Sequence, residues 1–177
     1  GATTVANAAA LNISGGINVA EAITISGSGV SNNGVIRSTS GNNTLSGQIT
    51  ISAHAQIQSD ANTLTLNVAS SSSITASNKN ITFDGAGNIT VSDPIATGSG
   101  TLTKTGSGTL TLSAANTYTG ATTISAGVAA ISNNTSFGTT DAATTIASGA
   151  ALNVSGGVTV AEAITINGTG VSSNGAI

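Results

Sequence analysis

This 177-residue chain has no cysteine, methionine or tryptophan, and it has only one proline, one tyrosine and two phenylalanines. Without cysteine, its stability does not depend on disulfides. Only 5% of the residues are charged, against about a quarter in a typical soluble domain. Serine, threonine, asparagine and glycine must therefore supply its solubility.

The charge balance argues against nucleic-acid binding. The net charge is −3, and the three cations, Arg37, Lys79 and Lys104, are dispersed along the chain. Neutralising phosphates takes clusters of lysine and arginine. We also expect no membrane insertion by this segment, because uninterrupted apolar runs such as residues 128–131 are far shorter than the ~20 residues of a spanning helix.

Short runs of alternating apolar and polar residues recur throughout the chain. Alternation of this kind predicts strands with one buried face and one hydroxyl-rich face. Glycine and asparagine, which accept positive φ, separate the runs as expected at turns, and no 3.6-residue apolar period predicts a helix. The runs lie at residues 11–14, 22–26, 48–52, 63–68, 81–83, 88–92, 109–113 and 122–125.

A long internal repeat organises the chain. Residues 142–177 align with residues 1–36 without a gap and are identical at 25 of 36 positions, an offset of 141 throughout. We therefore expect residues 1–177 to form a single continuous fragment that holds one 141-residue unit and the start of the next. Because the pattern stops in mid-unit and neither end carries a cap, we expect the natural protein to be longer.

Many short strands with close turns are compatible with a sandwich, a barrel or a solenoid. The scarcity of core aromatics favours the solenoid, whose narrow interior is filled by stacked aliphatic side chains. The low charge also fits, since in-register stacking places like charges about 4.8 Å apart. We expect asparagine amides of successive coils to form ladders. Coils of roughly 18 to 24 residues would give about six to eight coils and on the order of 30 to 40 Å of rod per unit.

One segment carries a specific motif. Residues 98–127 read GSGTLTKTGSGTLTLSAANTYTGATTISAG, and with Val128 this motif extends over about residues 98–128. It resembles the passenger-associated β-strand repeat of bacterial autotransporters. The matching positions, all structural in the family, are Leu102, Lys104, Gly106, Gly108, Leu110, Leu112, Asn116, Thr117, Tyr118, Gly120, Thr122, Ile124 and Gly127.

The resemblance implies an all-β fold, a right-handed parallel β-helix, together with export beyond the cytoplasm and a role in adhesion or surface architecture. It implies no catalytic residue. The residues themselves add two expectations. Lys104 lies on the same side of the predicted strand as Leu102, so an unbroken strand would bury its ammonium group. We therefore expect the chain to turn at Lys104 to Gly108, where Gly106 and Gly108 supply the bend. Tyr118 should lie over the end of a coil with its hydroxyl near solvent.

Parallel β-helices also house polysaccharide-cleaving enzymes, which need grouped carboxylates. Asp60, Asp84 and Asp93 are the acids in the middle of the unit, and the last two occupy ordinary turn positions. His54, the single histidine, has no second imidazole or thiol for a metal site and should face outward. We therefore expect no catalytic residue, no metal and no cofactor.

The sequence thus predicts a non-catalytic structural repeat of an extracellular fibre or rod on a bacterial surface. Its expected partners are further copies of the same repeat, end to end or side by side. The alternative is an autotransporter-type adhesin, a passenger or stalk that binds host or matrix glycans. An exposed aromatic or acidic groove would distinguish the adhesin from the scaffold, because sugars stack on aromatic rings.

Overall fold

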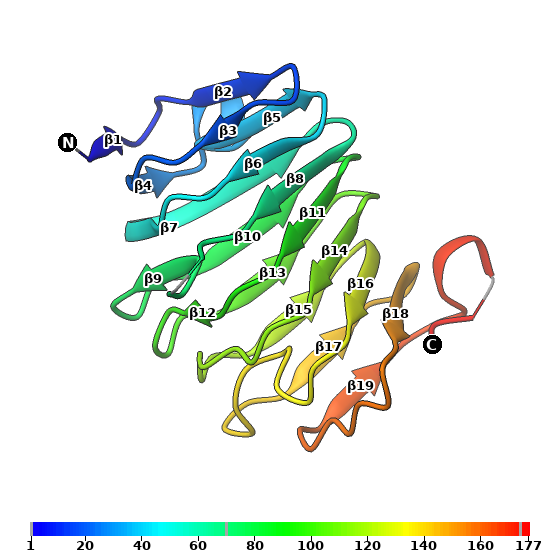
Figure 1. Ribbon diagram of the computed structural model, residues 1–177. Coiled ribbons are helices and arrows are strands. Elements are labelled where there is room, and N and C mark those ends of the chain that lie inside the picture. The colour runs from blue at the N-terminus through cyan, green and yellow to red at the C-terminus, as the bar shows by residue number, and fades with distance from the viewer. Residues whose placement is uncertain (1, 70, 174) are drawn as a thin grey trace.

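The computed structural model describes residues 2–69, 71–173 and 175–177. The chain is a parallel β-solenoid, as predicted, with strands of successive coils stacked along one axis (Figure 1). In the described part of the chain, no helix is long and apolar enough to cross a lipid bilayer.

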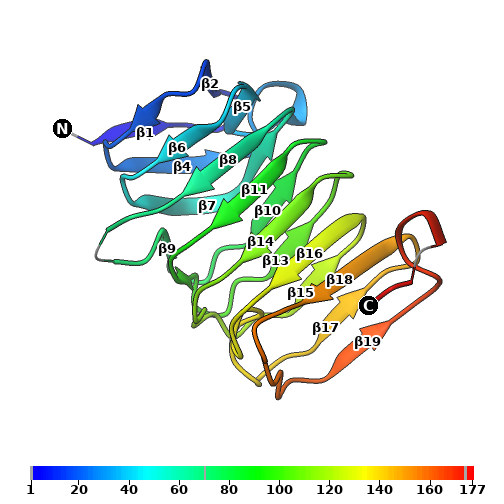
Figure 2. The same ribbon diagram turned by 45° about the vertical axis from the view of Figure 1, so that its right-hand side comes forward.

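The strands form three parallel stacks, which the chain visits in the same order in successive coils (Figure 2). Over the residues described, the coils that follow β12 (Ile95–Ala96) have strands on the second and third stacks alone. The first stack comprises β1 (Thr3–Val5), β4 (Ile23–Gly27), the start of β7 (Ile49–Ser59), β9 (Ile74–Ala76) and β12 (Ile95–Ala96). The second comprises β2 (Leu11–Ser14), β5 (Ile36–Ser40), the end of β7, β10 (Ile81–Asp84), β13 (Leu102–Lys104), β15 (Thr122–Ile124), β17 (Thr144–Ile146) and β19 (Ile164–Ile166). The third comprises β3 (Asn18–Val19), β6 (Asn43–Leu45), β8 (Thr63–Leu66), β11 (Asn88–Val91), β14 (Thr109–Leu112), β16 (Gly127–Ile131) and β18 (Ala150–Val154). Two short 3-10 turns, η1 (Val30–Asn32) and η2 (Val171–Ser173), follow β4 and β19.

Strand β7 joins the first two stacks into one twelve-stranded sheet. Ile51, near its start, pairs with Ile25 of β4, and Ile57, near its end, pairs with Ile36 of β5. Between these pairings, residues 52–54 are all exposed. The alternation in the sequence predicted only the first part of this strand, because residues that round a corner do not alternate.

The core consists of aliphatic side chains stacked in register. On the first stack, the isoleucines at 23, 49, 74 and 95 pair in sequence and are at most 2% exposed. Neighbouring strands lie about 4.8 Å apart, so each side chain contacts the one above and the one below. Burying each isoleucine contributes about 1.5–3 kcal/mol relative to leaving it exposed. Stacked aliphatic side chains of this kind make up most of the core.

The outward positions carry hydroxyl groups in place of charges. On the second stack, five threonines are consecutive partners in the sheet: residues 82, 103, 123, 145 and 165. Arg37 and Asp60 form the single ion pair of the described residues, with 2.7 Å between Nε and Oδ2. Contacts between coils therefore rest almost entirely on uncharged groups.

Asparagine side chains bind the backbone of neighbouring coils, and the expected amide-to-amide ladders are not what connects them. The Oδ1 atom of Asn88 accepts a hydrogen bond from the Thr109 amide at 3.0 Å, and Asn80 does the same for Thr101 at 3.0 Å. The physical reason is that a coil leaving its strand has main-chain N–H groups without a sheet partner. An amide oxygen one coil away satisfies such a donor, so each of these asparagines connects two coils.

Candidate functional site

The motif of residues 98–128 crosses all three stacks, and its apolar members are core residues. Leu102, Leu110, Leu112 and Ile124 are at most 1% exposed, on strands β13, β14 and β15. Their register places each against a core residue of an adjacent coil, for example Leu110 against Ile89. These side chains therefore hold successive coils together.

Lys104 is the unusual member, because its ammonium group points into the solenoid. The residue is 2% exposed, and Nζ donates to the carbonyl oxygens of Thr105, of Gly106 at 2.8 Å and of Ala126 at 3.5 Å. Burial lowers its pKa from 10.5 to about 8, while the nearby Asp84 carboxylate opposes that shift. The ammonium thus binds the inside of a corner, which the chain turns directly after Lys104.

Glycines form that corner because coils approach closely there. A Cβ atom at Gly108 would lie 1.9 Å from the carbonyl oxygen of Gly87 in the preceding coil. One at Gly127, in the following coil, would lie 2.4 Å from the carbonyl oxygen of Gly108, and Gly106 adopts a φ of +67°. Gly120 has the same role at another corner, 2.3 Å from a carbonyl oxygen of Gly100. Only glycine fits these positions without a backbone shift.

Asn116 connects three successive coils from a buried position. Its Oδ1 accepts from the Ile95 amide of the coil before at 2.8 Å, and its Nδ2 donates to the Ser136 carbonyl of the coil after. The residue is 3% exposed. Its neighbour Thr117 is exposed, and its amide donates to the Ile95 carbonyl at 3.0 Å. Here a side chain replaces the hydrogen bonds of a strand on the first stack.

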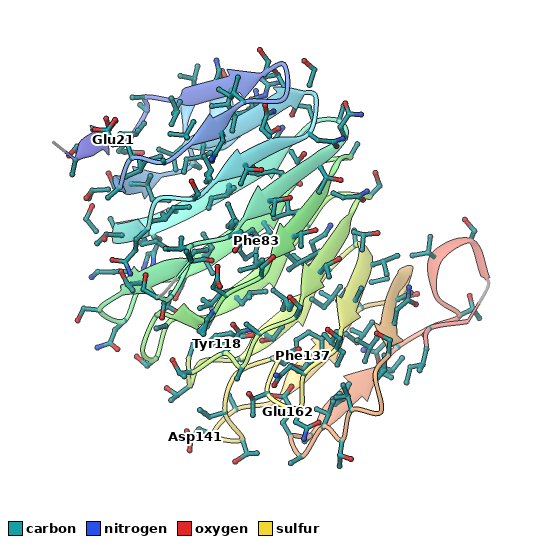
Figure 3. All side chains as sticks on the ribbon, in the orientation of Figure 1. Glu21, Phe83, Tyr118, Phe137, Asp141 and Glu162 are labelled. Carbon is teal, nitrogen blue, oxygen red and sulfur yellow. The ribbon has the colours of Figure 1, made fainter. Side chains whose placement is uncertain are left out.

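Tyr118 is buried, and the expectation that its hydroxyl lies near solvent was wrong. The hydroxyl lies 2.7 Å from Oγ1 of Thr122, which in turn donates to the Phe137 carbonyl at 3.5 Å. Tyr118 has no exposed surface, and burial raises the pKa of its hydroxyl well above the ordinary value. A Cβ atom at Gly138 would lie 3.0 Å from two carbon atoms of the ring, so glycine at that position leaves room for it. Figure 3 labels it toward the C-terminal half of the solenoid.

Two structural residues next to the motif escaped the sequence reasoning. Ser136 is buried and donates to the Leu112 carbonyl at 2.8 Å, and Phe137 is 2% exposed beside the Tyr118 hydroxyl network. Both lie in the stretch SNNTSFG, which reads as a loop because it lacks alternation. The phenylalanine was the one signal that this loop packs inward.

The three aspartates in the middle of the unit each make a separate contact within the protein. Asp60 binds Arg37, Asp84 accepts from the Gly85 amide at 2.7 Å, and Asp93 accepts from the Ser73 hydroxyl at 3.1 Å. His54 is exposed, and its Nδ1 accepts from the Asn80 amide at 2.9 Å. Among the described residues, no group of three potential metal ligands and no pocket is found.

The passenger-associated-transport-repeat family matches residues 102–128. That match coincides with the segment whose leucines, lysine, asparagine and glycines bind coil to coil. No curated protein and no solved structure matches the chain. A match to this repeat within a parallel β-solenoid supports an autotransporter passenger repeat protein, and that family implies secretion or exposure at the cell surface.

Proposed function

We propose that this chain is an autotransporter passenger repeat protein and that it forms a non-catalytic structural segment of a rod on a bacterial surface. The observation that carries the proposal is that polar residues of the motif form hydrogen bonds between coils. Asn116 bonds to the coils before and after it, and Lys104 binds carbonyls of two coils. Such side chains add stiffness along the axis, which is the property a rod requires.

The aromatic residues also support a scaffold over a glycan-binding adhesin. Phe83 and Tyr118 have no exposed surface, and Phe137 is 2% exposed. These three are all the phenylalanine, tyrosine and tryptophan residues in the chain, so no side chain of these types is free to stack on a sugar ring. The aspartates likewise engage structural partners, which supports a non-catalytic role.

Immunogold electron microscopy of intact source cells tests the proposal. With antibodies raised against residues 1–177, we expect gold to decorate thin rods outside the cell, and protease added to intact cells should remove the label. An antibody against a cytosolic enzyme serves as the control for cell integrity. Label that appears only after the cells are broken would overturn the surface assignment.

A glycan array probed with the purified chain tests the adhesin alternative. We expect no glycan to bind above the background given by a heat-unfolded sample of the same chain. Saturable binding that is lost on unfolding would show that the rod also recognises sugars.

A further inference from the structure

The two copies of the repeated segment share one local backbone. Thr3 pairs with Ile23 in the first copy, and Thr144 pairs with Ile164 in the second, which is the same register shifted by 141 residues. Ser31 and Ser172 both adopt an unusual positive φ, +54° and +53°. A main-chain hydrogen bond recurs as well. The Leu11 amide donates to the Val35 carbonyl at 2.9 Å, and the Leu152 amide donates to the Ala176 carbonyl at 2.8 Å.

The copies nevertheless occupy different stacks. Strand β1 (residues 3–5) lies on the first stack, whereas its equivalent β17 (residues 144–146) lies on the second, above β15. Strand β2 lies on the second stack, whereas its equivalent β18 lies on the third, above β16. Asn18 lies on the third stack. Its equivalent, Thr159, lies on the first, where its amide donates to Oδ1 of Asn134 in the preceding coil. Every element has moved on by one stack.

The length of the unit in coils explains the shift. From residue 3 to residue 144 the chain steps from stack to stack nineteen times, reaching residues 11, 18, 23, 36, 43, 49, 55, 63, 74, 81, 88, 95, 102, 109, 117, 122, 127, 139 and 144. At residues 117 and 139, where no strand forms, main-chain bonds to Ile95 and Tyr118 keep the first stack continuous. At three steps per coil, nineteen steps make six coils and one third.

We infer that consecutive units join coil on coil with a one-third turn at each junction. The next unit pairs with the edge formed by β15 and β16, and residues 3–13 of that further copy of the unit form the pairing strands. This inference rests on the proposed function only in assuming that units follow one another. The register is already given by the chain: Thr122–Ile124 receives the strand equivalent to Thr3–Val5, and Gly127–Ile131 receives residues 9–13.

In a rod built in this way, the residues exposed on a given side change from one unit to the next. A feature of the unit, such as the Arg37–Asp60 pair, recurs on each stack in turn. Each unit adds about 30 Å along the axis, since coils rise by about 4.8 Å. Successive units differ by about 120° before the twist of the solenoid itself is added. A partner that contacts one face meets the same residues again only after three units, about 90 Å farther on.

Disulfide formation in the full chain tests the junction, because the chain has no cysteine of its own. Thr123 and Thr145 are partners across the junction, whereas Thr4 and Thr24 are partners within the first unit. Partners on adjacent strands lie about 5 Å apart, within the Cα separation of a disulfide. We expect T123C/T145C and T4C/T24C to oxidise to similar extents under the same mild oxidant.

The T123C/T145C pair tests the junction, and the T4C/T24C pair is its reference. If T4C/T24C oxidises and T123C/T145C stays reduced, the second copy does not sit on β15 and the inference is overturned. The single variants T123C and T145C, which lack an internal partner, control for cross-linking between chains.

Cryo-electron microscopy of the full chain preceded by five further copies of residues 1–141 tests the rotation. We expect a rotation near 120° for each rise of about 30 Å, apart from the twist of the solenoid. A rotation near 0° would overturn the one-third turn. If source cells carry no surface rod, the proposed function fails, while both of these measurements still decide the junction.

Discussion

The hydroxyl of Tyr118 lies 2.7 Å from Oγ1 of Thr122, and both side chains are sealed inside the solenoid. The pair spans the corner that leads from the first stack to the second. Thr122 passes the hydrogen bond on to the Phe137 carbonyl of the next coil. A short chain of polar groups therefore crosses a core that is mainly aliphatic, and the first prediction concerns its hydrogen bonds.

Replacing Tyr118 by phenylalanine should lower the free energy of unfolding by about 1 kcal/mol, because one buried hydrogen bond is lost without a cavity. Urea denaturation followed by circular dichroism measures the change. Thr122→Val should cost a similar amount, and the double variant should cost less than the sum of the two. Strict additivity would show that the hydroxyls do not interact.

Lys104 should make the protein more stable as pH rises from 8 to 9.5. Its pKa is about 8 in the folded chain against 10.5 unfolded, so over this range the unfolded chain binds more protons. The folded state therefore gains about 1 to 2 kcal/mol. Urea midpoints at a series of pH values measure this rise. Lys104→Met, which keeps an unbranched stem, should show no such rise; an equal rise in both proteins would assign the effect to another group.

Asn116→Ala should cost about 3 kcal/mol, because the Ile95 amide and the Ser136 carbonyl lose their partner inside the protein. Asn88→Ala is the matched control. Asn88 also bonds to the next coil, through the Thr109 amide, but it is exposed and water can replace it. We expect that control to cost less than about 1 kcal/mol. Equal losses in thermal unfolding would contradict the inter-coil role of Asn116.

Gly108→Ala should destabilise the corner by more than about 3 kcal/mol, since the new Cβ meets the Gly87 carbonyl and the backbone must move. Gly149→Ala separates this clash from backbone strain. Gly149 has a φ of +83° but open space around its Cβ position, so we expect a cost of about 1–2 kcal/mol. Hydrogen exchange of the two variants should show opening near residue 108 in the first alone.

Much of the fold follows from the sequence because alternation and packing coincide. Leu110 and Leu112 share a face in the pattern and in the core. Lys104 is buried as well, although the sequence predicted that the chain turns there because an unbroken strand would bury its ammonium group. The shift between stacks was beyond the sequence, since it depends on the length of every coil. Register steps range from 19 residues, between Leu112 and Ile131, to 28, between Gly27 and Ala55. An error of one third of a coil in a unit of about six coils is enough to assign the start of the next unit to the wrong stack.

The site was predictable as a motif and not as a set of contacts. Tyr118 was placed near solvent because tyrosine usually keeps its hydroxyl wet. Nothing in the sequence shows that Thr122 and the Phe137 carbonyl receive that hydroxyl inside the protein. In the same way, the composition indicated that asparagine connects coils, but the pairing of amide oxygens with main-chain donors needed coordinates.

The scarcity of charge has a further consequence for the environments that the rod withstands. Coils are joined chiefly by main-chain amides, amide side chains and aliphatic contacts. The Lys104 ammonium binds carbonyl groups of two coils, and the described residues contain one ion pair. Dissolved salt screens charges at the surface but leaves such contacts largely unaffected. We therefore expect the rod to keep its length and stiffness at both low and high salt concentration. The same change in salinity would loosen a fibre held together by opposite charges.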